Sequence, residues 1–470
     1  MRVLSHPVRA RIDPPAAFAA LFADSAHAVW LDSGSHATSG MSVMGDGSRW
    51  LTSSVHEGTV TIASPHDSST AAGSVFDVLR ADLAAHRVAA VSGFPLGWVG
   101  WLGYELRAIT MGVESVGRSR YPDAALAFID RAVAFDHASG EVSLLALGES
   151  WSGELLAWRD EVESALTNAQ SQGIRHTTEV DVRSSSLEAT WAYDEVEYLD
   201  MIRACQAAIT AGDAYQLCLT TEARLAMTPD PFQTYLALRA SSPTHHGALL
   251  RAGEVSVLSA SPEQFLAVSA DGRVTTKPIK GTRRRGHTPG EDAALRDELV
   301  SSEKERAENL MIVDLMRNDI GRIARVGSVG VSDLLAVESY AQVHQLVSVV
   351  HGTLADDVDS IEAVTSCFPA GSMTGAPKSS ATRILHDLER RARGVYSGAL
   401  GYFGLDGSVD LAMVIRSIVL DEQGATIGTG GGITALSVPE EELDEVYLKA
   451  AALLRVLGAV DPRDTAAGRR

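Results

Sequence analysis

The chain has 470 residues, of which 45% are hydrophobic and 21% charged, an ordinary balance for a soluble globular protein. Its 40 basic and 60 acidic residues give a formal net charge of −20, which argues against nucleic acid and anionic membrane surfaces as partners. There is no apolar stretch typical of a transmembrane helix, no apolar core of a secretory signal in residues 1–15, and no CxxC spacing among the three cysteines. We therefore expect a cytoplasmic protein without disulfides or structural zinc.

Strand patterns separated by turns dominate the first part of the chain. Residues 125–135 and 141–147 predict a hairpin that turns at Asp136–Gly140. A polar segment from about 170 to 188, poor in large apolar residues, is the best candidate for a domain boundary. We expect an amino-terminal subdomain over residues 1–187, a catalytic domain over 188–460 and a frayed tail over 461–470.

Helices and strands follow in separate blocks after this boundary. Apolar residues at helical spacing predict helices over 195–211 and 439–457, and the strongest helical pattern runs over 293–322. The predicted strands run over 214–220, 254–270, 273–279, 397–404, 411–420 and 425–430. Because βαβ alternation is missing from the pattern, it favours an α+β fold over a doubly wound one.

Two of the predicted helices each carry a pair of glutamates three residues apart. These are Glu305 with Glu308 and Glu442 with Glu445, and this spacing places both carboxylates of a pair on one helical face. Two such pairs meeting across a cleft would offer the hard oxygen ligands that Mg²⁺ prefers. Lys449 follows Glu445 by one helical turn and is placed to face the same way. The alternative is a pair of solvated acidic faces.

A basic segment, residues 277–286, surrounds Lys280 on an otherwise acidic chain. It is either a solvated or nucleic-acid-binding patch or a loop that presents Lys280 into a cleft. A lysine acts as a nucleophile only when deprotonated, so in the second case its surroundings must lower its pKa from about 10.4.

A glycine run and a charged residue within a predicted strand also indicate a ligand site. The run Gly428–Ile433 lacks both Walker and GxGxxG spacing, so we interpret it as backbone that approaches a ligand carboxylate. Arg416 lies between apolar residues and needs a partner, either a structural acid or a bound carboxylate. The residues alone leave both options open.

Taken together, the motifs of the chain resemble those of the chorismate-binding enzymes: anthranilate synthase large subunits, aminodeoxychorismate synthases, and isochorismate and salicylate synthases. The match runs from about Trp191 to Leu457, with weaker similarity before it. Its motifs are Gly212–Gln216, Ser261–Glu263, Pro278–Thr282, Glu305–Asp319, Gly371–Lys378, Tyr396–Tyr402 and Gly430–Ile433. The resemblance implies an αββα sandwich of two large, mostly antiparallel sheets with the active site between them.

The resemblance also implies a role for each matched residue. Glu305, Glu308, Glu442 and Glu445 match the magnesium shell, and Glu263 matches the general acid near the C4 hydroxyl of chorismate. Substrate contacts are implied for Tyr396 and Arg416 at the enolpyruvyl carboxylate, for Lys449, Gly430, Gly431 and Gly432 at the ring carboxylate, and for Thr282, Thr374 and Gln216 elsewhere. Mg²⁺, Arg416 and Lys449 would let an acidic protein bind a dianion.

Three positions separate the subfamilies. Gln216 stands where isochorismate and salicylate synthases carry a lysine base, and Lys280 stands where anthranilate synthases carry alanine. Gln345 stands where anthranilate synthases usually have histidine, with His344 one place earlier, and Ala370 replaces a usual glycine.

These positions imply the reaction that the resemblance predicts. Chorismate and ammonia would give 4-amino-4-deoxychorismate, for p-aminobenzoate and folate synthesis, with Lys280 as nucleophile. Because no glutaminase motif is visible, we expect ammonia from a glutamine amidotransferase subunit. The alternatives are an anthranilate synthase large subunit and a non-catalytic chorismate-binding paralogue.

Overall fold

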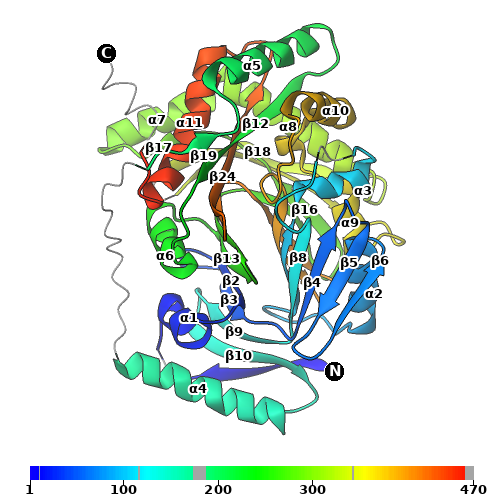
Figure 1. Ribbon diagram of the computed structural model, residues 1–470, viewed down its shortest axis with the longest axis vertical. Coiled ribbons are helices and arrows are strands. Elements are labelled where there is room, and N and C mark those ends of the chain that lie inside the picture. The colour runs from blue at the N-terminus through cyan, green and yellow to red at the C-terminus, as the bar shows by residue number, and fades with distance from the viewer. Residues whose placement is uncertain (10, 115–116, 173–186, 341–342, 461–470) are drawn as a thin grey trace.

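The structure is a computed structural model that describes residues 1–9, 11–114, 117–172, 187–340 and 343–460 (Figure 1). Its strands form two twelve-stranded sheets in which the paired strands are antiparallel. The first sheet has the order β1 (Arg2–Val8), β10 (Glu141–Gly148), β9 (Arg131–Asp136), β3 (Met41–Gly45), β2 (His27–Asp32), β13 (His246–Ala252), β14 (Val255–Ser261), β23 (Ser417–Asp421), β24 (Gly424–Ile433), β12 (Gln216–Leu225) and β11 (Thr190–Trp191), with β20 (Gly375–Ala376) paired to β12. The second has the order β17 (Ile279–Arg284), β19 (Val343–Thr353), β16 (Arg273–Lys277), β15 (Gln264–Val268), β22 (Val409–Met413), β21 (Ala399–Gly404), β7 (Gly97–Leu102), β8 (Ala124–Ile129), β4 (Arg49–Ser54), β5 (Thr59–Ala63) and β6 (Ser68–Ala72), with β18 (Gly330–Ser339) paired to β19.

Helices cover the outer faces of both sheets, so the predicted α+β sandwich is confirmed (Figure 1). One apolar core packs between the sheets, for example with Val257 of the first sheet and Trp98 of the second. Another lies between the first sheet and its helices and includes Phe18, Tyr235 and Leu454. Of the helices described, none is long and apolar enough to cross a membrane. The helices are α1 (Pro14–Phe22), α2 (Val75–Ala85), α3 (Arg107–Met111), α4 (Glu154–Gln172), α5 (Glu195–Thr210), α6 (Pro231–Ser241), α7 (Pro289–Ser301), α8 (Glu303–Gly321), α9 (Ser360–Cys367), α10 (Lys378–Glu389) and α11 (Pro439–Val456).

The amino-terminal part of the chain does not form a sheet of its own. In the first sheet β2 pairs with β13, and in the second sheet β7 pairs with β21. Both sheets therefore contain strands from before and after residue 187, and the division expected there does not separate two layers. Most of the predicted boundary segment and the predicted frayed tail, at 173–186 and 461–470, lie outside the described residues.

Three segments that each predict one long strand are pairs of strands in opposite sheets. Residues 125–135 divide into β8 and β9, residues 254–270 into β14 and β15, and residues 411–420 into β22 and β23. Glu263 lies at the second of these crossings and Arg416 at the third, where its φ of 51° is left-handed. The expectation that Arg416 lies within a strand is therefore wrong. The crossings carry both residues out of the sheets and toward the space between them.

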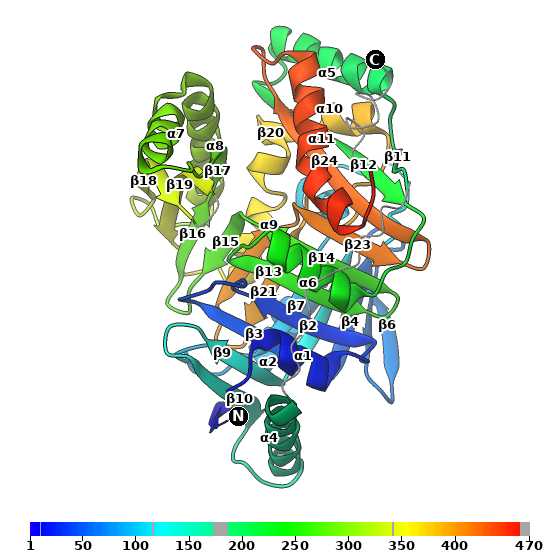
Figure 2. The same cartoon turned by 90° about the vertical axis from the view of Figure 1, so that its left-hand side faces the viewer.

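The longest predicted helix is also two elements. Ser302 ends α7 and caps α8, where its Oγ accepts a hydrogen bond from the backbone N–H of Glu305 at 3.4 Å. Glu305 thus lies in the first turn of a new helix, where a negative charge is favourable. The helices predicted over 195–211 and 439–457 are confirmed as α5 and α11. Figure 2 shows α8 and α11 on opposite sides of the upper half of the molecule.

Candidate active site

A cavity of about 460 Å³ lies between α8 and β17 on one side and α11 and β24 on the other. Most of the residues that the sequence singles out line this one cavity. They are Glu263, Lys280, Thr282, Glu305, Glu308, Tyr396, Arg416, Gly430, Gly431, Gly432, Glu442, Glu445 and Lys449. The two glutamate pairs, far apart in sequence, therefore line the same cleft.

Three of the four glutamates have a partner. Arg283 Nη1 lies 3.4 Å from Glu305 Oε1, and Lys449 Nζ lies 2.6 Å from Glu445 Oε1. Glu442 Oε1 accepts a hydrogen bond of 2.7 Å from a serine hydroxyl, that of Ser437.

Glu308 differs from the other three glutamates. Within the described residues it has neither a hydrogen bond nor an ion pair of 4.0 Å or less. Its burial raises the pKa of its carboxyl, and the neighbouring carboxylates Glu305 and Glu445 add to that rise. The glutamates therefore repel one another across the cavity.

The donor set fits a hard divalent cation such as Mg²⁺. It consists of carboxylate oxygens, and a cation would relieve the repulsion that raises the pKa of Glu308. In the part of the chain that the structure describes, no group of three or more His, Cys, Asp or Glu side chains is arranged so that it could hold a metal ion. The ion pairs of Glu305 and Glu445 would have to rearrange, and magnesium binding stays a prediction.

Lys280 enters the cavity from β17, where the strand bends at Gly281. A Cβ at Gly281, whose φ is 83°, would lie 2.9 Å from Glu305 Oε2, so glycine lets the strand approach α8 closely. Among the described residues, Lys280 Nζ has no hydrogen-bond or ion-pair partner. Burial by itself would lower its pKa, but the charges of Glu308, Glu263 and other groups outweigh burial and raise it. The lowered pKa expected for a nucleophile is therefore not found in this arrangement, because the carboxylates face Lys280 directly.

Glu263 also lines the cavity, at the crossing from β14 to β15 between the sheets. Burial raises the pKa of its carboxyl to about 7, against the opposing effects of Lys280 and a hydrogen bond with Ser372. A carboxylic acid with a pKa near the operating pH can both give and take a proton. This is the property that the predicted general acid requires.

This pKa leads to a pH prediction. The Glu263 carboxyl must be protonated to act as an acid, whereas the Lys280 amine must be neutral to attack. Above about pH 7 the loss of protonated Glu263 offsets the gain in neutral Lys280, so kcat should rise to a flat limb there when the free ammonia concentration is held constant. Glu263→Gln should lower kcat by about 100-fold or more and remove this limb of the profile. Glu105 is a matched control, because burial also raises its pKa to about 7 and it does not line the cavity. Loss of the limb in Glu105→Gln instead would contradict the assignment.

Cationic groups line the wall formed by β24 and α11. Lys449 Nζ donates to the Gly430 carbonyl at 2.8 Å, and Arg416 Nη1 donates to the Lys449 carbonyl at 3.4 Å. No acid within 4.0 Å pairs with Arg416 among the described residues, which favours a bound carboxylate over a structural acid as its partner. Gly428 has a packing role, since a Cβ there would lie 2.1 Å from the Tyr396 ring.

Two predicted substrate contacts, Gln216 and Thr374, do not line the cavity. Gln216 is buried behind Gly432, where a Cβ on that glycine would lie 2.3 Å from Gln216 Nε2. The Thr374 hydroxyl donates to the carbonyls of Ala370 and Gly371 at 3.2 and 3.3 Å. A direct substrate contact of either side chain stays a prediction.

Strand β19 separates the neighbours His344 and Gln345. Gln345 lines the cavity, whereas His344 is buried on the other side, with Nδ1 2.7 Å from Ser339 Oγ and Nε2 3.0 Å from Asp292 Oδ1. His344 therefore does not replace the histidine of anthranilate synthases.

Lys304 also lines the cavity and was not predicted as a site residue. Its position next to Glu305 in the sequence is the feature that could have indicated it.

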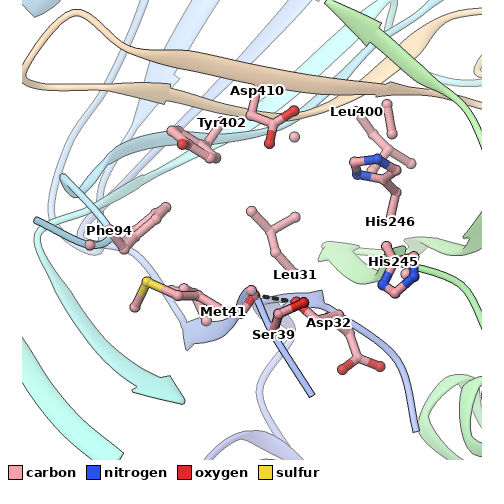
Figure 3. A pocket seen from close by; sticks show the side chains of 17 residues that line it. Leu31, Asp32, Ser39, Met41, Phe94, His245, His246, Leu400, Tyr402 and Asp410 are labelled. Atoms are coloured by element: carbon pink, nitrogen blue, oxygen red, sulfur yellow. Dashed lines mark hydrogen bonds between the residues drawn. The ribbon is translucent and has the colours of Figure 1, made fainter. Parts of the chain in front are cut away.

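A second cavity, of about 440 Å³, lies between the two sheets (Figure 3). Leu31 and Met41 reach it from the first sheet, and Tyr402 and Asp410 from the second. Its lining includes none of the residues predicted for the site. The predicted chemistry thus belongs to the cavity between α8 and α11.

The comparisons with known proteins agree with this geometry. A family model described as chorismate binding enzyme matches residues 27–455. An aminodeoxychorismate synthase of Streptomyces griseus is 44% identical over 98% of this chain, and one of Streptomyces pristinaespiralis is 42% identical over 97%. The chain spans 65% of the length of each of these two relatives.

More distant relatives are anthranilate synthases. Component 1 from Mycolicibacterium smegmatis is 34% identical over 92% of this chain and 83% of its own length. The structure of component I from Streptococcus pneumoniae TIGR4 superimposes with a TM-score of 0.76 at 28% identity, covering 89% of this chain and 92% of that one. The chain belongs to the family of chorismate-binding enzymes.

Proposed function

We propose that this chain is a cytoplasmic enzyme that converts chorismate and ammonia to 4-amino-4-deoxychorismate, on the route to p-aminobenzoate and folate. The observation that carries the proposal is the unpaired Lys280 Nζ in the same cavity as Glu263, a group suited to proton transfer. The names of the two Streptomyces relatives support it. The test is incubation of the chain with chorismate, Mg²⁺ and ammonium, followed by identification of the product.

Substrate binding follows from the charges that line the cavity. Arg416 and Lys449 provide the cationic groups for the two carboxylates of chorismate, and the backbone of Gly430–Gly432 adjoins them. Mg²⁺ held by Glu305, Glu308, Glu442 and Glu445 would neutralise a substrate carboxylate and the negative field that raises the pKa of Lys280.

The reaction then proceeds in two displacements. The neutral amine of Lys280 adds at C2 of the ring, the ring double bonds shift, and the C4 hydroxyl leaves as water with the proton of Glu263. Ammonia adds at C4, the double bonds return, and the C2–N bond breaks to release the Lys280 amine. The Glu263 carboxylate takes one proton from the new ammonium group. Each step avoids a direct exchange at C4, which is how a covalent intermediate lowers a barrier.

The glutamines at positions 216 and 345 should decide which products do not form. Gln345 lines the cavity and Gln216 lies behind Gly432, and an amide cannot act as a base at neutral pH. Without ammonia, chorismate should therefore not be converted to isochorismate or salicylate. With ammonia, a coupled lactate dehydrogenase assay should detect no pyruvate. Dominant formation of anthranilate, isochorismate or salicylate would contradict the subfamily assignment and favour the alternative functions.

We further propose that ammonia comes from a glutamine amidotransferase partner. Burial raises the pKa of all three thiols, Cys205, Cys218 and Cys367, so each is poorly suited to attack glutamine. The purified chain should use ammonium salts at high pH and should not use glutamine, as measured by product formation with each nitrogen source. Glutamine-dependent turnover by the chain alone would refute this.

A further inference from the structure

Lys304 is a charged residue of the cavity to which the proposed reaction gives no role. It is the second residue of α8 and precedes Glu305. Its Nζ lies 3.6 Å from Glu442 Oε1, which belongs to α11 on the opposite wall. Among the ion pairs of the described residues, this is the one that joins α8 to α11.

The position of Lys304 is not explained by helix stability. A positive charge in the first turn of a helix opposes the macrodipole, and the residues on both sides of Lys304 are glutamates that suit this position. The side chain is 54% exposed, so little packing holds it in place. Its contact across the cleft is the remaining reason for a lysine here.

The need of Glu442 for a cationic partner explains the lysine at position 304. Its side chain is 4% exposed and its one described hydrogen bond comes from the Ser437 hydroxyl, which is neutral. A positive partner offsets the hydration that an ionised carboxylate loses on burial. Glu305 and Glu445 have Arg283 and Lys449 as partners, which leaves Lys304 as the cation for Glu442.

We propose that Lys304 is a displaceable counter-ion of the carboxylate cavity. Its ammonium neutralises Glu442 and links α8 to α11, and it must leave Glu442 before the carboxylates of the two helices can share a divalent cation. This inference rests on the metal site of the proposed function. Because more than half of the side chain is already exposed, the ammonium can turn into solvent without unpacking the core.

Direct titration of Mn²⁺ and Mg²⁺ into the chorismate-free protein, by calorimetry, tests the proposal. Lys304→Gln should bind each cation at least about tenfold more tightly, because it removes a positive charge next to the site. Lys304→Arg keeps the charge and should bind as the wild type does. Arg306→Gln is the matched control, since it removes one exposed charge from the same helix outside the cavity and should not change affinity.

Three outcomes would overturn the proposal. If Lys304→Gln binds cations no more tightly than Arg306→Gln does, Lys304 is not a counter-ion, whereas the metal site itself stands. If instead the KM for chorismate rises with cation affinity unchanged, Lys304 is a substrate contact. If neither the wild type nor any variant binds a cation, the metal part of the proposed function fails as well. Circular dichroism melting of each variant shows that the comparison is made on folded protein.

Discussion

Lys280→Arg should lower kcat by about a thousandfold or more, the order of loss seen when an enzyme loses its nucleophile. Arginine keeps the positive charge and much of the volume, but its guanidinium is not deprotonated in proteins and cannot attack C2. Lys277→Arg is the matched control, because Lys277 lies three residues earlier and pairs with Glu338 outside the cavity. It should retain activity close to that of the wild type.

If Lys280 were instead a charged anchor for a substrate carboxylate, Lys280→Arg would be expected to retain activity. The surrounding carboxylates raise its pKa, which would suit a permanently charged anchor for a substrate carboxylate. An anchor should tolerate arginine, whereas a nucleophile should not. Intact-protein mass spectrometry, after quenching with chorismate and Mg²⁺ but no ammonia, should show an adduct in the wild type and none in Lys280→Arg. Wild-type turnover in Lys280→Arg would exclude the nucleophile and leave the family assignment intact.

Removal of the divalent cation should abolish activity, and Glu308→Gln or Glu445→Gln should each cost several kcal/mol of transition-state stabilisation. The four glutamates face a dianionic substrate in the cavity, and Glu308 has no cationic partner of its own among the described residues, so a metal would be needed to offset their repulsion of the substrate. Glutamine preserves the shape of each side chain and removes the charge. Kinetics with and without EDTA, and direct Mn²⁺ titration of each variant, measure the effect.

Neighbouring glutamates provide the controls for this prediction. Glu303 and Glu441 are exposed, lie on the same two helices and do not line the cavity. Glu303→Gln and Glu441→Gln should therefore change kcat/KM little. Undiminished activity in EDTA, or equal losses in Glu303→Gln and Glu308→Gln, would rule out the metal assignment.

The elements that could be predicted from the sequence are those with a clear period and clear ends. The helices α5 and α11 begin and end within two residues of the prediction. The three sheet crossings could not be predicted, because β14 and β15, or β22 and β23, are largely buried and join into one apolar pattern. Alternation of side chains reveals a strand but not the sheet to which the strand belongs.

The candidate site, like the fold, could be predicted from the sequence only in part. The spacing of Glu305 and Glu308 predicts a shared helical face, and the matched motifs indicate which other residues to expect in the cavity. The ion pair of Lys304 with Glu442 could not be predicted, since 138 positions separate the partners in sequence. The direction of the Lys280 pKa shift was also out of reach, because it depends on the balance between burial and carboxylates from several elements.

The product formed from chorismate, Mg²⁺ and ¹⁵N-labelled ammonium tests the central claim most directly. Mass spectrometry and nuclear magnetic resonance of the purified product should show 4-amino-4-deoxychorismate with the label on C4 and the enolpyruvyl group retained. Labelled anthranilate with release of pyruvate, or a product labelled at C2, would contradict the account.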